Sequence, residues 1–189
     1  MELVVFDLET TGLSPTAHDI IQIAAVRVRF DRVLHTESYS TFVNPGYRIP
    51  PFITSYTGIS DSNVRNAPSA AQALAEFSRF VGSNTLLAHN GHRFDMPFIR
   101  AACTKTGLPT RIVNYADSIY LSKNIWKESR KHGLDAIIER LSLNTRNFRR
   151  HDARGDVGIL AAAVTKMWRR LDPDRTSFPA PLFTGILPK

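Results

Sequence analysis

The order of the apolar segments along the chain is the feature that most constrains its fold. Three β-type segments come first, in residues 3–8, 20–30 and 33–43, and Asp31-Arg32 is the expected hairpin connection between the last two. Because their connections are short, these strands are expected to form an antiparallel meander. Helices and strands then alternate. This order predicts an α/β fold with a mixed sheet that is antiparallel at its start and flanked by helices.

Two further strands, over residues 85–89 and 112–115, complete a predicted sheet of five strands. Apolar residues at helical spacing predict helices later in the chain, and a further helical pattern starts at Asp117. Prolines are frequent after residue 172, so we expect one domain over residues 1–172 and an irregular C-terminal tail over 173–189. The predicted helices cover residues 70–81, 95–106, 134–141 and 157–171.

Composition excludes several classes of protein. The chain has 189 residues, of which 43% are hydrophobic, so it can bury a core and is not disordered. No apolar run approaches the roughly 18 residues of a membrane span, and no basic segment precedes the apolar N-terminal run. The single cysteine, Cys103, excludes a disulfide framework and a Cys-based zinc site. We therefore expect no membrane anchor and no secretion, and a cytoplasmic or, in a eukaryote, nuclear location.

Two carboxylates mark the end of the first strand. Asp7 and Glu9 are two residues apart, so the alternation of a strand sends both side chains to the same face. Such a pair at the end of an apolar strand repels itself unless a cation lies between its members, and oxygen ligands favour a hard divalent ion. Alone, an Asp-x-Glu pair is more often a solvated strand end.

Three further residues strengthen the metal hypothesis. Asp95 follows the strand at 85–89 and stands at the start of a predicted helix, and Asp156 stands near the start of the helix at 157–171. Helix capping and interaction with the helix dipole are the alternative roles of these two acids. His151 lies five residues before Asp156, and a histidine near metal-bound water can accept its proton. An exposed loop histidine is the alternative.

These segments together resemble the signature motifs of the DEDD exonuclease superfamily. Asp-Leu-Glu-Thr-Thr-Gly at residues 7–12 resembles the first motif, and His-Asn-Gly-His-Arg-Phe-Asp at 89–95 resembles the second. Residues 151–156 resemble the third motif in the form His-x-Ala-x-x-Asp, which marks the histidine branch, called DEDDh or DnaQ-like. The tyrosine branch would have Tyr where this chain has Asp152. The resemblance implies the ribonuclease H-like α/β fold.

Within the DEDDh branch, the motif details are closest to TREX-type DNA exonucleases. Three residues separate Asn90 from Phe94, where the proofreading type usually has two, and the pair Asp117-Ser118 follows a short strand. The chain departs from TREX proteins at Thr10, where they usually have Ala, and at Arg154, where they usually have Glu. The dimer of TREX proteins is therefore not inferred for this chain, whose oligomeric state could be a monomer or a homodimer.

The resemblance also implies a mechanism. It implies that Asp7, Glu9, Asp95 and Asp156 hold two Mg²⁺ ions, for which Mn²⁺ substitutes, and that His151 takes the proton from the attacking water. The implied activity is 3′-to-5′ removal of 5′-mononucleotides from the 3′ end of DNA, with a preference for single strands.

The candidates for contact with the nucleic acid lie in or beside the motifs. The loop after Glu9 is implied to receive the terminal nucleotide, with Leu13 wedged between bases. Two aromatic side chains are candidates for base stacking, although core packing is an equal alternative for Phe94. Asn90 either orients the site or caps a turn. The candidates are Thr10, Thr11, Gly12, Leu13, Tyr56, Asn90 and Phe94.

Charge points to the same kind of partner. The chain has 24 Lys and Arg against 17 Asp and Glu, a net charge of +7, and basic residues gather between residues 117 and 150. Arg149 and Arg150 directly precede His151, and we expect them to neutralise backbone phosphates. A solvated helix face is the alternative, especially for Lys123 and Lys127.

Two other functions stay open. One is an exoribonuclease of the same superfamily that trims RNA from its 3′ end. The other is a polymerase-associated proofreading or nucleic-acid-binding module, in one version without catalysis. All five motif residues are present, which argues against the loss of catalysis.

Overall fold

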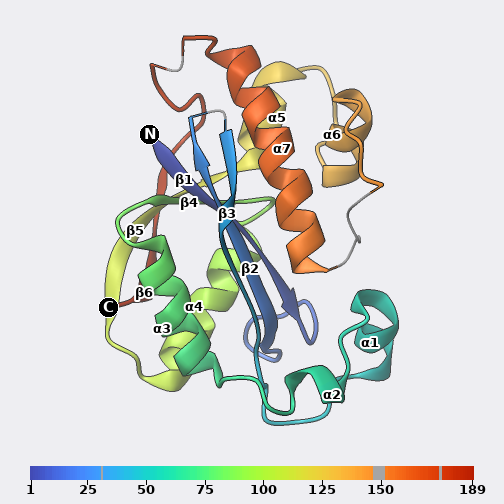
Figure 1. Cartoon of the computed structure of the whole chain (residues 1–189), viewed down its shortest axis with the longest axis vertical. Coiled ribbons are helices and arrows are strands. Elements are labelled where there is room, and N and C mark those ends of the chain that lie inside the picture. Colours follow the sequence, from blue (N-terminus) through green and yellow to red (C-terminus); the bar gives the residue numbers. More distant parts are fainter. Residues whose placement is uncertain (31, 147–151, 175) are drawn as a thin grey trace.

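A six-stranded sheet with helices on both faces forms the molecule (Figure 1). The computed structural model describes residues 1–30, 32–146, 152–174 and 176–189. The strand order is β3-β2-β1-β4-β5-β6. Helices α3 and α4 share one core cluster with the sheet, and α5, α6 and α7 share a second cluster on the opposite face. The predicted α/β architecture with a mixed, helix-covered sheet is confirmed.

The first three strands form the predicted antiparallel meander. They are β1 (Glu2–Thr10), β2 (Ile20–Arg29) and β3 (Arg32–Phe42), and β2 pairs antiparallel with both others. On β1, Val4 and Phe6 enter the core cluster under α3 and α4, whereas Leu3 and Val5 enter the cluster under α7. Because both faces are buried, the strand reads as a continuous apolar run.

The other strands lie on the far side of β1. Strand β4 (Thr85–Ala88) pairs parallel with β1, and β5 (Thr110–Asp117) pairs parallel with β4. The prediction of five strands is wrong, because β6 (Phe183–Pro188) pairs antiparallel with β5 and closes that edge of the sheet. The C-terminal tail is thus not irregular throughout. Pro188 is tolerated at the end of β6, because one side of an edge strand has no neighbouring strand with which to form backbone hydrogen bonds.

The predicted helices are present, with one extended. They are α3 (Ala70–Val81), α4 (Asp95–Thr106), α5 (Ser118–Ile125), α6 (Leu134–Arg140) and α7 (Ala153–Leu171). Helix α7 begins four residues before the expected start, because the side chain of Asp152 accepts a hydrogen bond from the backbone N–H of Arg154 and caps it there.

Two short helices were not predicted. They are α1 (Pro51–Thr57) and α2 (Asp61–Val64), in a segment that its prolines and glycines indicated as a loop. Their apolar residues form a small third core cluster with Ile21 of β2, and this packing stabilises helices that are too short to persist alone. In the part of the chain that the structure describes, no helix is both long enough and apolar enough to cross a membrane.

Candidate active site

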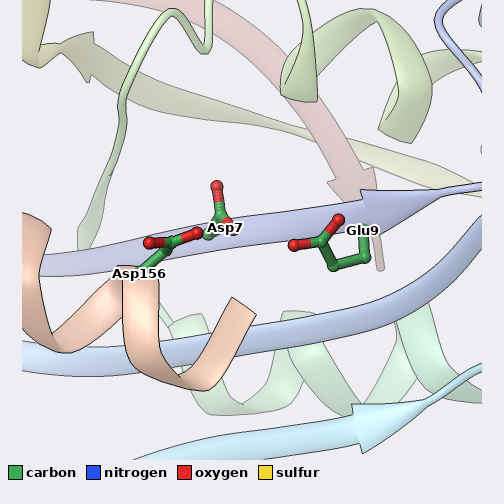
Figure 2. Close-up of side chains that lie close together, drawn as sticks. All are labelled: Asp7, Glu9 and Asp156. Carbon is green, nitrogen blue, oxygen red and sulfur yellow. The ribbon is translucent and has the colours of Figure 1, made fainter. Parts of the chain in front are cut away.

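Three of the four predicted acids lie together beside β1. Asp7 and Glu9 lie on one face of the strand, and Asp156 lies in the first turn of α7, which packs on that face (Figure 2). One carboxylate oxygen of each residue lies within 4.8 Å of the other two. This spacing allows a single divalent cation to contact all three carboxylates.

The fourth acid, Asp95, comes from the opposite layer of the molecule. It is the first residue of α4 and is 1% exposed. Among the described residues, its Oδ1 is the one buried side-chain oxygen or nitrogen without a hydrogen-bond partner. Burial raises the pKa of this carboxyl well above its usual range, and the charges of Asp117 and Glu9 raise it further. A buried carboxyl with an unsatisfied oxygen is costly unless it receives a cation or a proton.

The electrostatics of Glu9 point the same way. Burial raises the pKa of the Glu9 carboxyl to about 7, and the charges of Asp156 and Asp152 add to the effect. The repulsion among these carboxylates is relieved by a bound divalent cation, whose oxygen-only ligand set they match. The four acids therefore fit the metal ions that the family resemblance implies. The unsatisfied Oδ1 of Asp95 is the observation that supports this fit most directly.

The loop after Glu9 is held by its own polar groups. The Thr10 hydroxyl donates to the carbonyl oxygen of Gly12 (2.6 Å), and the backbone N–H of Asp19 donates to the Thr11 hydroxyl (3.0 Å). The ring of His18 lies so close over Gly12 that a Cβ there would be 2.4 Å from it, so any larger residue at this position requires the ring to move. Leu13 is 84% exposed beside this fixed backbone, as a side chain that wedges between bases would be.

Three exposed aromatic side chains lie in residues 47–56, and one of them, Tyr47, contacts the same loop. Tyr56 is among the predicted contact residues, whereas the sequence did not single out Tyr47 or Phe52. The hydroxyl of Tyr47 hydrogen-bonds the Thr11 hydroxyl (2.7 Å), which ties α1's leading segment to the loop. No periodicity marks these two residues in the sequence. Their signal is only that large aromatic groups follow a proline-glycine turn.

The segment of the second motif is shaped by Asp117. This buried carboxylate accepts hydrogen bonds from the backbone N–H groups of Asn90 (3.0 Å) and His92 (3.2 Å), as well as from Ile119, where it caps α5. Asn90 has a φ of 59°, a left-handed conformation that asparagine tolerates better than most residues. The turn that leads to Asp95 is therefore fixed from β5.

Phe94 takes the packing role that was its alternative. Its ring centroid is 4.9 Å from that of Phe98, and its side chain packs against the core cluster under α3 and α4. It is only partly buried, so part of this residue remains accessible next to Asp95 in the sequence.

The catalytic base and two phosphate contacts of the prediction fall outside the described residues. These are His151, Arg149 and Arg150. The structure describes the chain again from Asp152, the residue directly after His151, and so includes the start of α7.

Comparison with protein families and sequences identifies the chain's relatives. The RNase_T family model, described as an exonuclease, matches residues 4–164. The PolC-type DNA polymerase III of Streptococcus sanguinis is 37% identical over 140 residues, which are 74% of this chain and 9% of that protein. The same polymerase of Caldanaerobacter subterraneus is 35% identical over 170 residues, 90% of this chain and 12% of that one. The chain thus spans about a tenth of the length of these relatives.

Solved structures share the fold. The nuclease domain of 3′hExo, a DEDDh family member bound to rAMP, superposes with a TM-score of 0.79 over 96% of each chain at 18% identity. Exonuclease X in complex with 5′ overhanging duplex DNA gives 0.73 at 22% identity, over 94% of this chain and 96% of that one. Escherichia coli exonuclease I in a single-stranded DNA complex gives 0.73 at 19% identity, over 92% and 42%.

The predicted ribonuclease H-like fold and the predicted superfamily are thereby confirmed. The family match covers all three motif segments and most of the sheet. The chain belongs to the RNase_T exonuclease family.

Proposed function

We propose that this chain is a divalent-metal-dependent exonuclease that removes 5′-mononucleotides from the 3′ end of DNA and prefers single strands. The observation that carries the proposal is the set of carboxylates. Asp7, Glu9 and Asp156 have oxygens within 4.8 Å of one another, and buried Asp95 has an oxygen that lacks a partner. Such a set matches the hard-cation sites at which phosphodiester bonds are hydrolysed.

The chain's own residues divide the work of hydrolysis. The four acids would hold two Mg²⁺ ions, which when bound supply an activated water and neutralise charge on the phosphate oxygens. A ring nitrogen of His151 accepts the proton of the attacking water. The new bond joins the water oxygen to phosphorus, and the bond between phosphorus and the 3′ oxygen of the preceding nucleotide breaks. The released nucleotide keeps a 5′-phosphate, and the shortened strand ends in a 3′-hydroxyl.

The loop after Glu9 is well placed to receive the 3′ end. Thr10, Thr11 and Gly12 offer a backbone that their hydrogen bonds hold rigid, so little order has to be gained on binding. Exposed Leu13 and Tyr56 provide apolar faces for unpaired bases, and stacking of this kind holds single strands without reading their sequence. We propose Asn90 and the partly buried Phe94 as further contacts with the nucleic acid. We add Tyr47 and Phe52 to this set of contact residues.

Arg149 and Arg150 are proposed to contact backbone phosphates upstream of the 3′ end. Replacing both by Glu is expected to raise the Kd for a single-stranded oligonucleotide far more than it lowers the turnover of bound substrate. The slope of log Kd against log salt concentration should become shallower, because fewer counterions are released. The measurement is a fluorescence-anisotropy titration at several salt concentrations in Ca²⁺. The matched control is the double variant Lys123→Glu/Lys127→Glu, which makes the same two charge reversals at one residue of α5 and one residue just after it. An unchanged salt slope would refute the contact.

Metal binding is expected to stabilise the protein more at pH 8 than at pH 6. The pKa of Glu9 in the metal-free protein is raised to about 7 from its ordinary value of 4.5, so its stabilising contribution is complete below 4.5 and is lost as the pH rises through 7. Below pH 7 a cation must displace the proton of Glu9 in order to bind. Above pH 7 the cation binds the ionised carboxylate and relieves the repulsion among the acids. Thermal midpoints with and without saturating Mg²⁺ at both pH values test this, with Glu9→Gln as the control that reduces the pH dependence and leaves the part that comes from Asp95. Equal shifts at pH 6 and pH 8 would contradict the ligand role of Glu9.

A proofreading module is the second candidate. The sequence relatives are PolC-type DNA polymerases III, and this chain matches about a tenth of their length. That supports DNA rather than RNA as the substrate and a polymerase as a partner. A proofreading enzyme acts on the frayed 3′ end of a primer, so duplex ends with a terminal mismatch should be cut faster than paired ends. The rAMP bound to one structural relative keeps the RNA alternative in the test.

One time course separates these activities. The substrates are 3′- and 5′-labelled oligonucleotides of DNA and RNA, single-stranded, paired and mismatched at the 3′ end, with Mg²⁺, Mn²⁺ or EDTA. We expect a ladder that shortens from the 3′ end, release of 5′-mononucleotides and faster cutting of single-stranded DNA. Failure to release mononucleotides with either metal would leave a binding module. Faster cutting of RNA would favour the exoribonuclease.

A further inference from the structure

Gln22 lies beside the candidate active site but is not one of its acids. It is the residue on β2 that pairs with Glu9 of β1, and it is 1% exposed. Because paired residues on adjacent strands point to the same face of a sheet, its side chain shares the face on which α7 packs. A buried glutamine in this place needs partners for both ends of its amide.

The Gln22 amide finds both partners at the start of α7. Its Nε2 donates a hydrogen bond to Oδ1 of Asp152 (3.2 Å), and its Oε1 accepts one from the backbone N–H of Ala153 (3.0 Å). The two bonds span 130 and 131 residues of sequence. The central sheet and the first turn of the helix that carries Asp156 are therefore joined through this one side chain.

The chemistry of this connection fits an amide. Hydrogen bonds from Arg154 hold the pKa of Asp152 below its usual range, so Asp152 is a carboxylate that only accepts, whereas the N–H of Ala153 only donates. An amide has one donor end and one acceptor end in a single plane. A carboxylate at position 22 would face two other carboxylates, Asp152 and Glu9, and a hydrocarbon would leave the buried N–H without a partner.

Arg154 holds the Asp152 carboxylate as well. Arg154 donates to it from Nε (3.0 Å) and Nη2 (2.6 Å), and the guanidinium lies over the ring of Phe42, 5.8 Å from its centroid. Asp152, whose backbone lies at the helix start, is thus bonded by both Gln22 and Arg154. The residue before it in the chain is His151.

We propose that Gln22 is a positioning residue for catalysis, which fixes the backbone of Asp152 and Ala153 at the start of α7, directly after His151 in the sequence. This inference rests on the proposed function of His151 as the base. Asp156 depends on Gln22 less, because α7 continues for 19 residues and many of its apolar side chains are buried against the sheet. Loss of the amide should therefore impair proton transfer more than metal binding.

A double-mutant cycle tests this coupling. Gln22→Met, His151→Ala and the double variant are compared by kcat at saturating oligonucleotide and Mg²⁺. Gln22→Met alone is expected to lower kcat on the order of 10- to 100-fold, the scale of a misplaced catalytic group. The KM and the metal concentration at half-maximal rate should change less than about twofold, because ground-state contacts remain. In the His151→Ala background the same substitution should change kcat less than about twofold, because its target is absent.

The matched control is the other glutamine of the chain, Gln72, which closes the capping box of α3 away from the acids. Gln72→Met should lower the thermal midpoint without lowering kcat. Gln22→Asn displaces the amide by one methylene, and the same cycle with this variant decides the matter if Gln22→Met does not fold. An equal fall in kcat with and without His151 would overturn the inference alone. An unchanged kcat in His151→Ala would overturn the proposed base and the inference with it.

Discussion

Replacing Asp7 by alanine is expected to lower kcat about 10³-fold or more, the scale of losing an electrostatic stabiliser of a phosphoryl-transfer transition state. Asp7 contributes one of three carboxylate oxygens that lie within 4.8 Å of one another. Without it, a cation retains fewer ligands and is held less tightly in the position that the phosphate requires. The measurement is the initial rate of mononucleotide release at saturating Mg²⁺, together with the Mg²⁺ concentration at half-maximal rate.

The fold of the Asp7→Ala protein should survive. Removing one negative charge lowers the total repulsion within the cluster, and the apolar residues of β1 keep their packing. The thermal midpoint without metal should therefore stay close to that of the unaltered protein, while the stabilisation by Mg²⁺ is reduced. Asp174→Ala removes an exposed carboxylate elsewhere and serves as control. Turnover near the unaltered rate in Asp7→Ala would refute the ligand role.

The second large effect is expected from His151→Ala. Loss of a general base costs typically 10²- to 10⁴-fold in rate, so kcat should fall by about that factor. Binding of DNA and metal should remain largely intact, because the four acids and the loop after Glu9 are unchanged. The measurement combines kcat with the oligonucleotide Kd in Ca²⁺. The fall in kcat toward acid pH in the unaltered enzyme should disappear in the variant, since the group that must lose a proton is gone.

His35→Ala is the matched control for this variant. His35 is an exposed histidine on edge strand β3, so its loss should leave kcat and its pH profile unchanged. Residual activity of His151→Ala near that of the unaltered enzyme would exclude the base role. A large increase in the oligonucleotide Kd with unchanged turnover of bound substrate would instead make His151 a binding residue.

The sequence predicted the central part of the fold because periodicity there reports burial directly. Strand β1 is apolar on both faces, whereas β2 is buried over most of its length and alternates only at its end, and each pattern follows from what covers those strands. Asp117 was predicted to start α5, because the capping chemistry is local.

What was missed depends on contacts between distant segments. Strand β6 exists because the tail reaches the open edge of β5, where a Cβ at Gly185 would be 2.4 Å from the end of the Met96 side chain and 3.3 Å from Tyr115. Helices α1 and α2 depend on packing around Ile21. Neither arrangement leaves a periodic pattern in the local sequence, so proline and glycine content alone indicated irregular chain.

The candidate site likewise has features that the sequence predicts and features that it does not predict. The acids were found from strand alternation and motif spacing, and the structure brings Asp7, Glu9 and Asp156 together. The sequence carried no sign that Asp95 would arrive from the other layer with an unsatisfied oxygen, or that Gln22 would join β2 to α7. Those features come from side chains more than 80 residues apart that the sheet brings into contact, and no local pattern reports such a meeting.

The most direct test of the account is to locate the metal. A crystal of the protein grown with Mn²⁺ and a 5′-mononucleotide, measured at the manganese absorption edge, shows bound ions by their anomalous signal. The account predicts two ions, with Asp7, Glu9 and Asp156 among their ligands and Oδ1 of Asp95 taken up by one of them. An anomalous map without ions at these carboxylates, or with Asp95 Oδ1 still unpartnered, would contradict it.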